Sequence, residues 1–157
     1  MKVLRILGGV LGVLLVVVAA AYALRTNPVG PVAGRGLTGE AAAYPPDWSF
    51  SDAHMTIAVE VRPDDPHSIT TICFVHEGAL YVPAQGGSDK QWTHIVSEDP
   101  RVRLKIGERI YSARADRVPD LDFDEFAASA QQKYSALADA NEPPPDVWLF
   151  RIGPREG

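Results

Sequence analysis

A run of 19 residues without a charge, residues 6–24, is the feature that most limits what the start of this chain can become. As an α-helix rising about 1.5 Å per residue, the run reaches about 28 Å, close to the hydrocarbon thickness of about 30 Å of a bilayer. Every face of that helix is apolar, which does not suit a helix on the surface of a soluble domain. The run therefore predicts a membrane anchor over residues 1–25, with one transmembrane helix embedded through residues 6–24.

A cleavable signal peptide is the alternative, because the small residues Ala19, Ala21 and Ala23 could form a cleavage site. The apolar part of a signal peptide usually spans about 7–15 residues, which is shorter than this run. The flanking charges predict the orientation, because basic residues prefer the cytoplasmic side. Lys2 and Arg5 lie on the short side of the run. We therefore expect a single-pass protein of the cell membrane with its N-terminus in the cytoplasm and its domain outside.

The remainder of the chain has the composition of one acidic domain. Residues 26–157 contain 12 Lys and Arg against 20 Asp and Glu. That balance argues against nucleic acid as a partner, because its binding needs cations that neutralise phosphates. Cys73 is the only cysteine, which excludes an intramolecular disulfide and a zinc site built from cysteines. The four histidines show no ligand spacing, so no metal site is expected.

Residues 26–47 differ from the rest in composition. They contain four prolines and four glycines, which is typical of a linker or of an irregular arm laid over a domain. Arg35 and Leu37 are the two members expected to make specific contacts. The folded domain is then expected to occupy residues 48–157.

Within that domain, apolar residues alternate with a period of two, which indicates strands with one buried face. Two other segments have helical spacing instead, and the second begins with a capping pair formed by Asp122 and Glu125. We expect a mainly β (α+β) fold, a small antiparallel barrel with two helices. The expected strands are 56–61, 68–75, 79–82, 102–106, 109–118 and 147–152, and the expected helices are 90–97 and 123–137.

The stretch that most suggests a binding site runs from Gly86 to Trp92. Glycines let the backbone approach an anion, so the amides after Gly86 and Gly87, the hydroxyl of Ser88 and the ammonium of Lys90 could hold a phosphate. Trp92 could then offer a flat face to a planar ring system. The alternative is structural: the two glycines form an ordinary turn, and Trp92 anchors the following helix in the core.

The other chemically interesting side chains give weaker signals. Cys73 lies in an apolar strand and is interpreted as a small buried hydrophobe. The catalytic residues are unknown from the sequence, with His94 and Tyr81 as candidates for a proton donor. Three cations share one strand face, and they could either reinforce a phosphate site or form a solvated edge that discourages aggregation: Arg101, Arg103 and Lys105.

The order of these elements resembles the flavin-binding split β-barrel family, which includes pyridoxamine 5'-phosphate oxidase-like and deazaflavin-dependent nitroreductase-like branches. The resemblance covers about residues 55–152 and includes the segment DPRVRLKIGERIYSARADRV. The residues that carry it are Gly86, Gly87, Lys90, Trp92, Asp99, Pro100, Arg101 and Val102.

That resemblance implies a six-stranded split barrel, usually a homodimer, that binds FMN or a deazaflavin. Ser68, Ile69 and Thr70 would contact the ring, and Ser88 and Lys90 would hold the phosphate near the glycine loop. The implied activity is that of an oxidoreductase that transfers hydride or electrons to a small acceptor such as a quinone or a nitro compound.

One segment departs from the family's pattern. Where the family carries a basic cluster before the second strand, this chain has Arg62–His67, which is net acidic. The departure favours a second hypothesis, in which the barrel binds no cofactor. The chain would then be a non-catalytic binding or interaction module tethered in the cell envelope.

Overall fold

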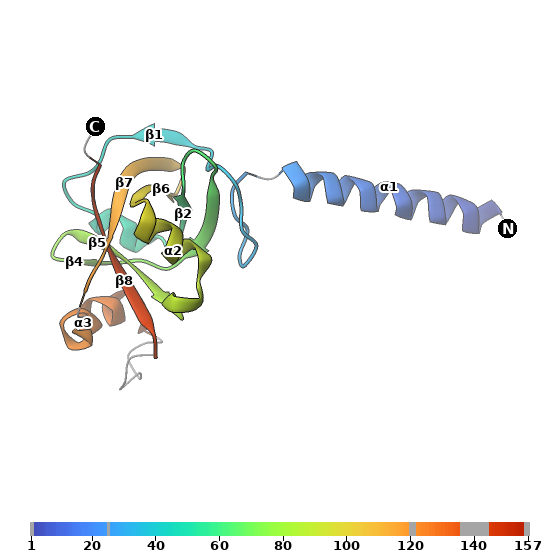
Figure 1. Cartoon of the computed structure of the whole chain (residues 1–157). Helices are drawn as coiled ribbons and strands as arrows, with labels where there is room; N and C mark the ends of the chain where they lie inside the picture. Colours follow the sequence, from blue (N-terminus) through green and yellow to red (C-terminus); the bar gives the residue numbers. More distant parts are fainter. Residues whose placement is uncertain (1, 25, 120–121, 136–144, 156–157) are drawn as a thin grey trace.

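A computed structural model describes residues 2–24, 26–119, 122–135 and 145–155. Helix α1 (Lys2–Leu24) extends away from a β-barrel that contains the remaining elements (Figure 1). Large apolar side chains between Val10 and Val18 on this helix are exposed. Among the described residues, however, no helix is both long and apolar enough to cross a membrane.

The barrel is one mainly antiparallel sheet of eight strands, in the order β3-β2-β6-β7-β8-β5-β4, with β1 added in parallel to β7. Strand β1 comes from the proline- and glycine-rich segment at residues 26–47 and, in Figure 1, runs along the end of the barrel opposite α3. The strands are β1 (Glu40–Ala42), β2 (Ile57–Val61), β3 (His67–Thr71), β4 (Phe74–His76), β5 (Ala79–Gln85), β6 (Arg101–Ile106), β7 (Arg109–Arg117) and β8 (Val147–Pro154).

The prediction of six strands is wrong by two. One extra strand is β1, and the other arises because the strand expected over residues 68–75 is divided into β3 and β4. At the break, the backbone of Cys73 bonds to a side chain and not to a neighbouring strand. Its amide donates to the hydroxyl of Tyr134 over 3.2 Å, and that hydroxyl lies 2.9 Å from the Cys73 carbonyl oxygen.

The two helices expected in the domain are present, and their ends differ from the expected ranges by one residue in the first and by the C-terminal end in the second. Helix α2 (Gln91–Glu98) follows a short 3₁₀ turn, η2 (Gly87–Asp89), and a second such turn, η1 (Ser49–Ala53), precedes β2. Helix α3 (Phe123–Lys133) begins after Asp122, whose side chain accepts from the amide of Asp124. Leu137, the last position predicted for this helix, lies outside the described residues.

Burial follows the predicted alternation. The inward residues of β2 and β6, among them Val59, Val61 and Leu104, join Trp48 and Phe150 in one core cluster, which α2 covers with Trp92 and Val96. A smaller cluster under α3 contains Phe74, Tyr81, Phe126 and Leu149.

The segment 26–47 is packed against the barrel, which favours the arm over a free linker. Leu37 is buried, and its amide donates to the carboxylate of Glu60. Arg103 ties the two together: its Nη1 lies 3.1 Å from both carboxylate oxygens of Glu60, and its Nη2 donates to the Leu37 carbonyl. Gly34 forms a backbone bridge with Ser68. We refer to residues 26–47 as the arm.

Candidate functional site

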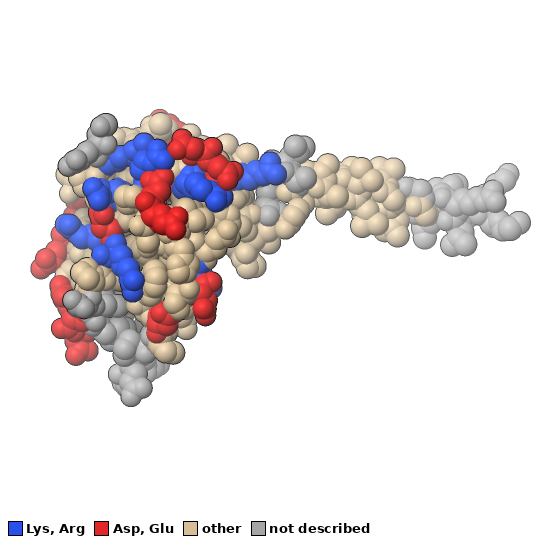
Figure 2. Space-filling view, viewed as in Figure 1, with Lys and Arg blue, Asp and Glu red and all other residues tan. Residues whose placement is uncertain are grey.

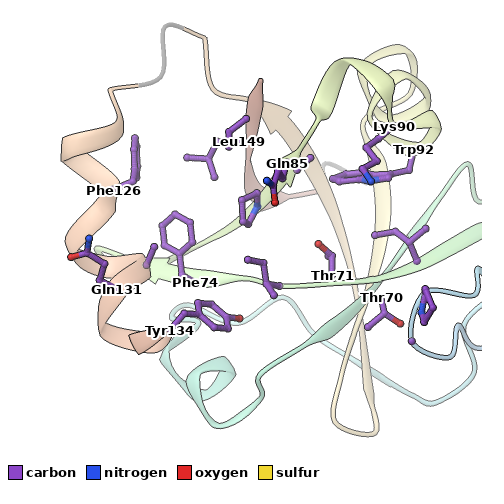
Figure 3. A pocket seen from close by; sticks show the side chains of 18 of the residues that line it. Thr70, Thr71, Phe74, Gln85, Lys90, Trp92, Phe126, Gln131, Tyr134 and Leu149 are labelled. Carbon is purple, nitrogen blue, oxygen red and sulfur yellow. The ribbon is translucent and has the colours of Figure 1, made fainter. Parts of the chain in front are cut away.

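A cavity of about 590 Å³ lies between β3 and β5, near the place where the sheet's two end strands, β3 and β4, are not hydrogen-bonded to each other in the strand order. One wall is α3, another is the beginning of α2, and Gly30, Pro31 and Ala33 of the arm close a third side. Figure 3 shows Trp92 and Lys90 on one side of this cavity and Phe126 and Gln131 of α3 on the opposite side. The volume is in the range of about 300–1,000 Å³ that is usual for small-molecule sites.

The lining is largely apolar and aromatic. Phe74, Phe126 and Tyr134 contribute rings, and Lys90 is the one charged residue among the described lining residues. None of the ion pairs formed within the described part of the chain involves Lys90. The arrangement suits a flat, mostly apolar ligand that presents one negative or electron-rich group to an ammonium.

The structure brings together half of the residues that the sequence assigned to cofactor binding. Ile69, Thr70, Lys90 and Trp92 all line the cavity. The other four, Ser68, Gly86, Gly87 and Ser88, are not among its lining residues. Ser68 is fully buried beside Gly34 of the arm, and its hydroxyl has no hydrogen-bond partner among the described residues.

The amides expected to hold a phosphate are already bonded within the chain. The amide and the hydroxyl of Ser88 donate to Oδ2 of Asp146 over 2.9 and 2.6 Å. The Gly87 amide donates to the Asp146 carbonyl oxygen over 2.9 Å, and the amides of Asp89 and Lys90 donate to the carbonyls of Gly86 and Gly87 in the same loop. The hydrogen bonds from Ser88 hold the pKa of the Asp146 carboxyl below its usual value. A carboxylate of the chain itself therefore stands where the sequence suggested a phosphate.

The two glycines and Trp92 also have structural roles. Gly86 has a left-handed backbone with φ of 65°, as a turn requires. A Cβ on Gly87 would lie 2.3 Å from Cγ of Trp148, so the glycine lets that indole pack on the loop. Trp92 is 7% exposed, and its ring centroid lies 5.2 Å from that of Phe150. Trp92 is thus mainly a core residue whose remaining surface lines the cavity.

Neither candidate proton donor is among the residues that line the cavity. Tyr81 is buried in the cluster under α3 and stacks on Phe74 with ring centroids 5.6 Å apart. His94 uses Nε2 to contact the carbonyl oxygen of Ser88 at 2.7 Å. Cys73 is fully buried, and burial raises the pKa of its thiol. The site therefore offers a shaped apolar chamber with a cation, and the described lining shows no acid–base pair.

The three cations on β6 are neutralised by nearby carboxylates. Arg101 pairs with Asp99 and Asp64, Arg103 pairs with Glu60, and Lys105 lies 3.4 Å from Glu108. On the face seen in Figure 2, basic and acidic side chains accordingly lie next to one another over the barrel. These cations do not line the cavity, so they do not reinforce an anion site there.

Sequence reasoning missed two walls of the cavity. Residues 30–33 carry no chemical motif, because Pro31 and Ala33 contribute only backbone and small apolar surface. Phe126 and Tyr134 were expected on the apolar face of a helix, and the same face that packs on the barrel also borders the cavity.

Comparison with known proteins identifies the fold. No family model matches the sequence, and no curated protein is significantly similar to it. Solved structures do resemble the chain. A proposed pyridoxamine 5'-phosphate oxidase from Listeria innocua is 18% identical, with 69% of this chain and 90% of that chain covered and a TM-score of 0.52. A conserved hypothetical protein from Mycobacterium tuberculosis is 16% identical, with coverages of 69% and 78% and a TM-score of 0.54.

A third neighbour is HutZ, a haem storage protein from Vibrio cholerae, which is 15% identical with coverages of 69% and 87% and a TM-score of 0.53. At these identities the likeness is one of fold. The chain is an α+β protein with a split barrel of the pyridoxamine 5'-phosphate oxidase-like kind, as the sequence resemblance implied.

Proposed function

We propose that the cavity between β3, β5 and α3 binds the ring of a flavin-type cofactor, and that the chain is an oxidoreductase acting on a small acceptor such as a quinone or a nitro compound. The observation that carries the proposal is the cavity of about 590 Å³, which has apolar and aromatic walls and the ammonium of Lys90, a group in none of the ion pairs between described residues. The fold of the neighbours adds support, since one of them is described as a proposed pyridoxamine 5'-phosphate oxidase.

The residues present fit the ring of such a cofactor better than they fit its phosphate. Flat apolar walls from Trp92 and Phe126 suit a conjugated ring, and Lys90 suits an electron-rich edge of it. A phosphate of FMN or of a deazaflavin would find one ammonium and loop amides that already bond elsewhere. When bound, the ring would supply the hydride or electron transfer, while the chain's own residues orient it and keep water away.

Two neighbouring alanines of α3 provide the test. Ala127 lines the cavity, whereas Ala128 is exposed on the same helix and lies outside it. In full-length protein purified in detergent, we expect flavin binding to quench flavin fluorescence. Ala127→Trp fills the cavity and should abolish the quenching, while Ala128→Trp should leave it unchanged. A folded wild-type protein that quenches neither FMN nor a deazaflavin would remove the oxidoreductase proposal.

A second function is favoured by a different observation. Asp146 already accepts hydrogen bonds from the amides of Gly87 and Ser88 in the glycine loop. Both candidate proton donors, Tyr81 and His94, lie away from the cavity lining. These contacts suit a non-catalytic binding or interaction module that uses the same barrel without a cofactor. This alternative predicts that the protein is colourless as isolated and that no flavin changes its melting temperature.

We also propose that the protein is a homodimer. One structural neighbour with 13% identity and a TM-score of 0.50 is described as a domain-swapped dimer. Light scattering of the detergent-solubilised protein, corrected for bound detergent, tests this proposal, and a mass of 17.0 kDa for the protein component would contradict it.

Finally, we propose that residues 6–24 attach the chain to the cell membrane, with the N-terminus in the cytoplasm and the barrel outside. The support is the uncharged run and its continuous helix, whose described apolar side chains are exposed. A reporter enzyme that is active only outside the cytoplasm, fused to the C-terminus, should be active. Release of the protein from membranes by alkaline carbonate would contradict an embedded helix.

A further inference from the structure

The loop at residues 86–90 is arranged around a negative charge, and Asp146 supplies that charge. The Asp146 carboxylate accepts two hydrogen bonds from Ser88 on Oδ2 and one from the Trp148 indole on Oδ1. Asp146 itself has a left-handed backbone with φ of 57°, which L-residues seldom adopt. Three side-chain hydrogen bonds and the bond from Gly87 to its carbonyl hold the residue in that conformation.

This carboxylate stands at the rim of the cavity. Gln85 and Val147 pair with each other across β5 and β8, and both line the cavity. Asp146 precedes Val147 and the glycine loop follows Gln85, so the carboxylate and its donors lie one step beyond the paired ends of these strands. Lys90, the cation of the cavity, follows in the same loop.

A ligand with a terminal phosphate would meet two obstacles at this rim. The amide and the hydroxyl of Ser88 are not free to donate to it, and the Asp146 carboxylate would repel it. A ligand with the same ring and an uncharged tail meets neither obstacle. We infer that Asp146 is a specificity-determining residue that makes this chain select ring ligands without a terminal phosphate. The inference rests on the proposed function, and it names the ligand class for that site.

Riboflavin and FMN are the matched probes, because they share the ring and differ only in the phosphate. In titrations of full-length protein, we expect wild type to bind riboflavin about tenfold more tightly than FMN or better, which corresponds to about 1.4 kcal/mol. Asp146→Gly removes the carboxylate and suits the left-handed backbone. In that variant the preference for riboflavin should disappear or reverse. Asp89→Ala removes one negative charge from the same loop and leaves the hydrogen bonds between Ser88 and Asp146 in place. This variant should keep the wild-type preference.

A second measurement separates this inference from the proposed function. Inorganic phosphate should raise the melting temperature of Asp146→Gly and leave wild type and Asp89→Ala unchanged, whether or not a flavin binds. If neither flavin binds any variant but this phosphate response is present, the flavin proposal fails and the role of Asp146 stands. Equal riboflavin and FMN affinities in wild type overturn the inference, and so does the absence of a phosphate response in Asp146→Gly. If Asp146→Gly does not fold, Asp146→Asn replaces it in both measurements and must show the same direction of change.

Discussion

Replacing Glu60 by glutamine tests whether a buried ion pair holds the arm on the barrel. The Glu60 side chain is 1% exposed and accepts from Leu37 and Arg103, while the Arg103 side chain is 32% exposed. Breaking a buried pair by changing one partner costs about 3–5 kcal/mol. Because Arg103 is partly in water, we expect the low end, a loss of about 3 kcal/mol, or about 10 °C in melting temperature for a domain of this size.

Thermal unfolding followed by circular dichroism measures this loss, and limited proteolysis shows whether the arm becomes accessible. Glu108→Gln is the matched control, because Glu108 pairs with Lys105 while its side chain is 90% exposed. Its pair should contribute less than about 1 kcal/mol. The double variant Glu60→Leu/Arg103→Met should recover only part of the stability, since apolar residues can replace a buried pair but leave the amide and carbonyl of Leu37 without these partners. If Glu60→Gln melts together with the Glu108 control, the pair does not hold the arm and the reasoning is refuted.

The remaining predictions concern packing and titration. Gly87→Ala should destabilise the fold by about 1–3 kcal/mol, measured by urea unfolding, because the Cβ of the new alanine would collide with the Trp148 side chain. Trp92→Ala should cost about 3–5 kcal/mol through lost packing on Phe150, so Trp92→Phe is the better variant for ligand titrations, with most of the stability retained. Burial raises the pKa of Tyr134 to about 12, so one tyrosine should ionise late in an ultraviolet titration, and Tyr134→Phe should remove that phase. Because the folded pKa is the raised one, the stabilising contribution of Tyr134 is complete below pH of about 10 and is lost as the pH rises through about 12.

Local pattern accounted for most of the barrel. The alternation of Val102, Leu104 and Ile106 predicted β6, and the turn at Gly107, whose φ is 61°, led into β7 as expected. In these elements, the alternating apolar residues that indicate a strand and the glycine that indicates the turn are only a few positions apart in the sequence. For that reason the sequence alone could specify them.

The differences arise from contacts between distant parts of the chain. The break after β3 lies where the amide of Cys73 bonds to the hydroxyl of Tyr134, which is 61 positions away in the sequence. No feature of the strand's own sequence indicates this contact. The strand expected over residues 79–82 continues through Pro83 to Gln85 as β5. The missing amide of Pro83 costs nothing there, because β4 pairs only with the first part of β5 and the open edge lies on the cavity.

In the candidate site, too, some residues could be predicted from local sequence and others depend on contacts between distant parts of the chain. The sequence located Lys90, Trp92 and the strand residues Ile69 and Thr70, all of which line the cavity. It could not show that Asp146, 58 positions away, would bond to the amide and hydroxyl of Ser88. A glycine-rich loop predicts that something negative will be held, and the partner follows only from the folded chain.

The arm limits the distance between the cavity and helix α1. Six peptide units join Leu24, at the end of α1, to Gly30 in the cavity wall, and at about 3.6 Å per residue they reach about 20 Å at most. The arm is held on the barrel a few residues later by the bond from the Leu37 amide to Glu60, so the part of the arm that lines the cavity is anchored close by. Any surface that holds α1 therefore also keeps this cavity wall within about 20 Å of the end of the helix.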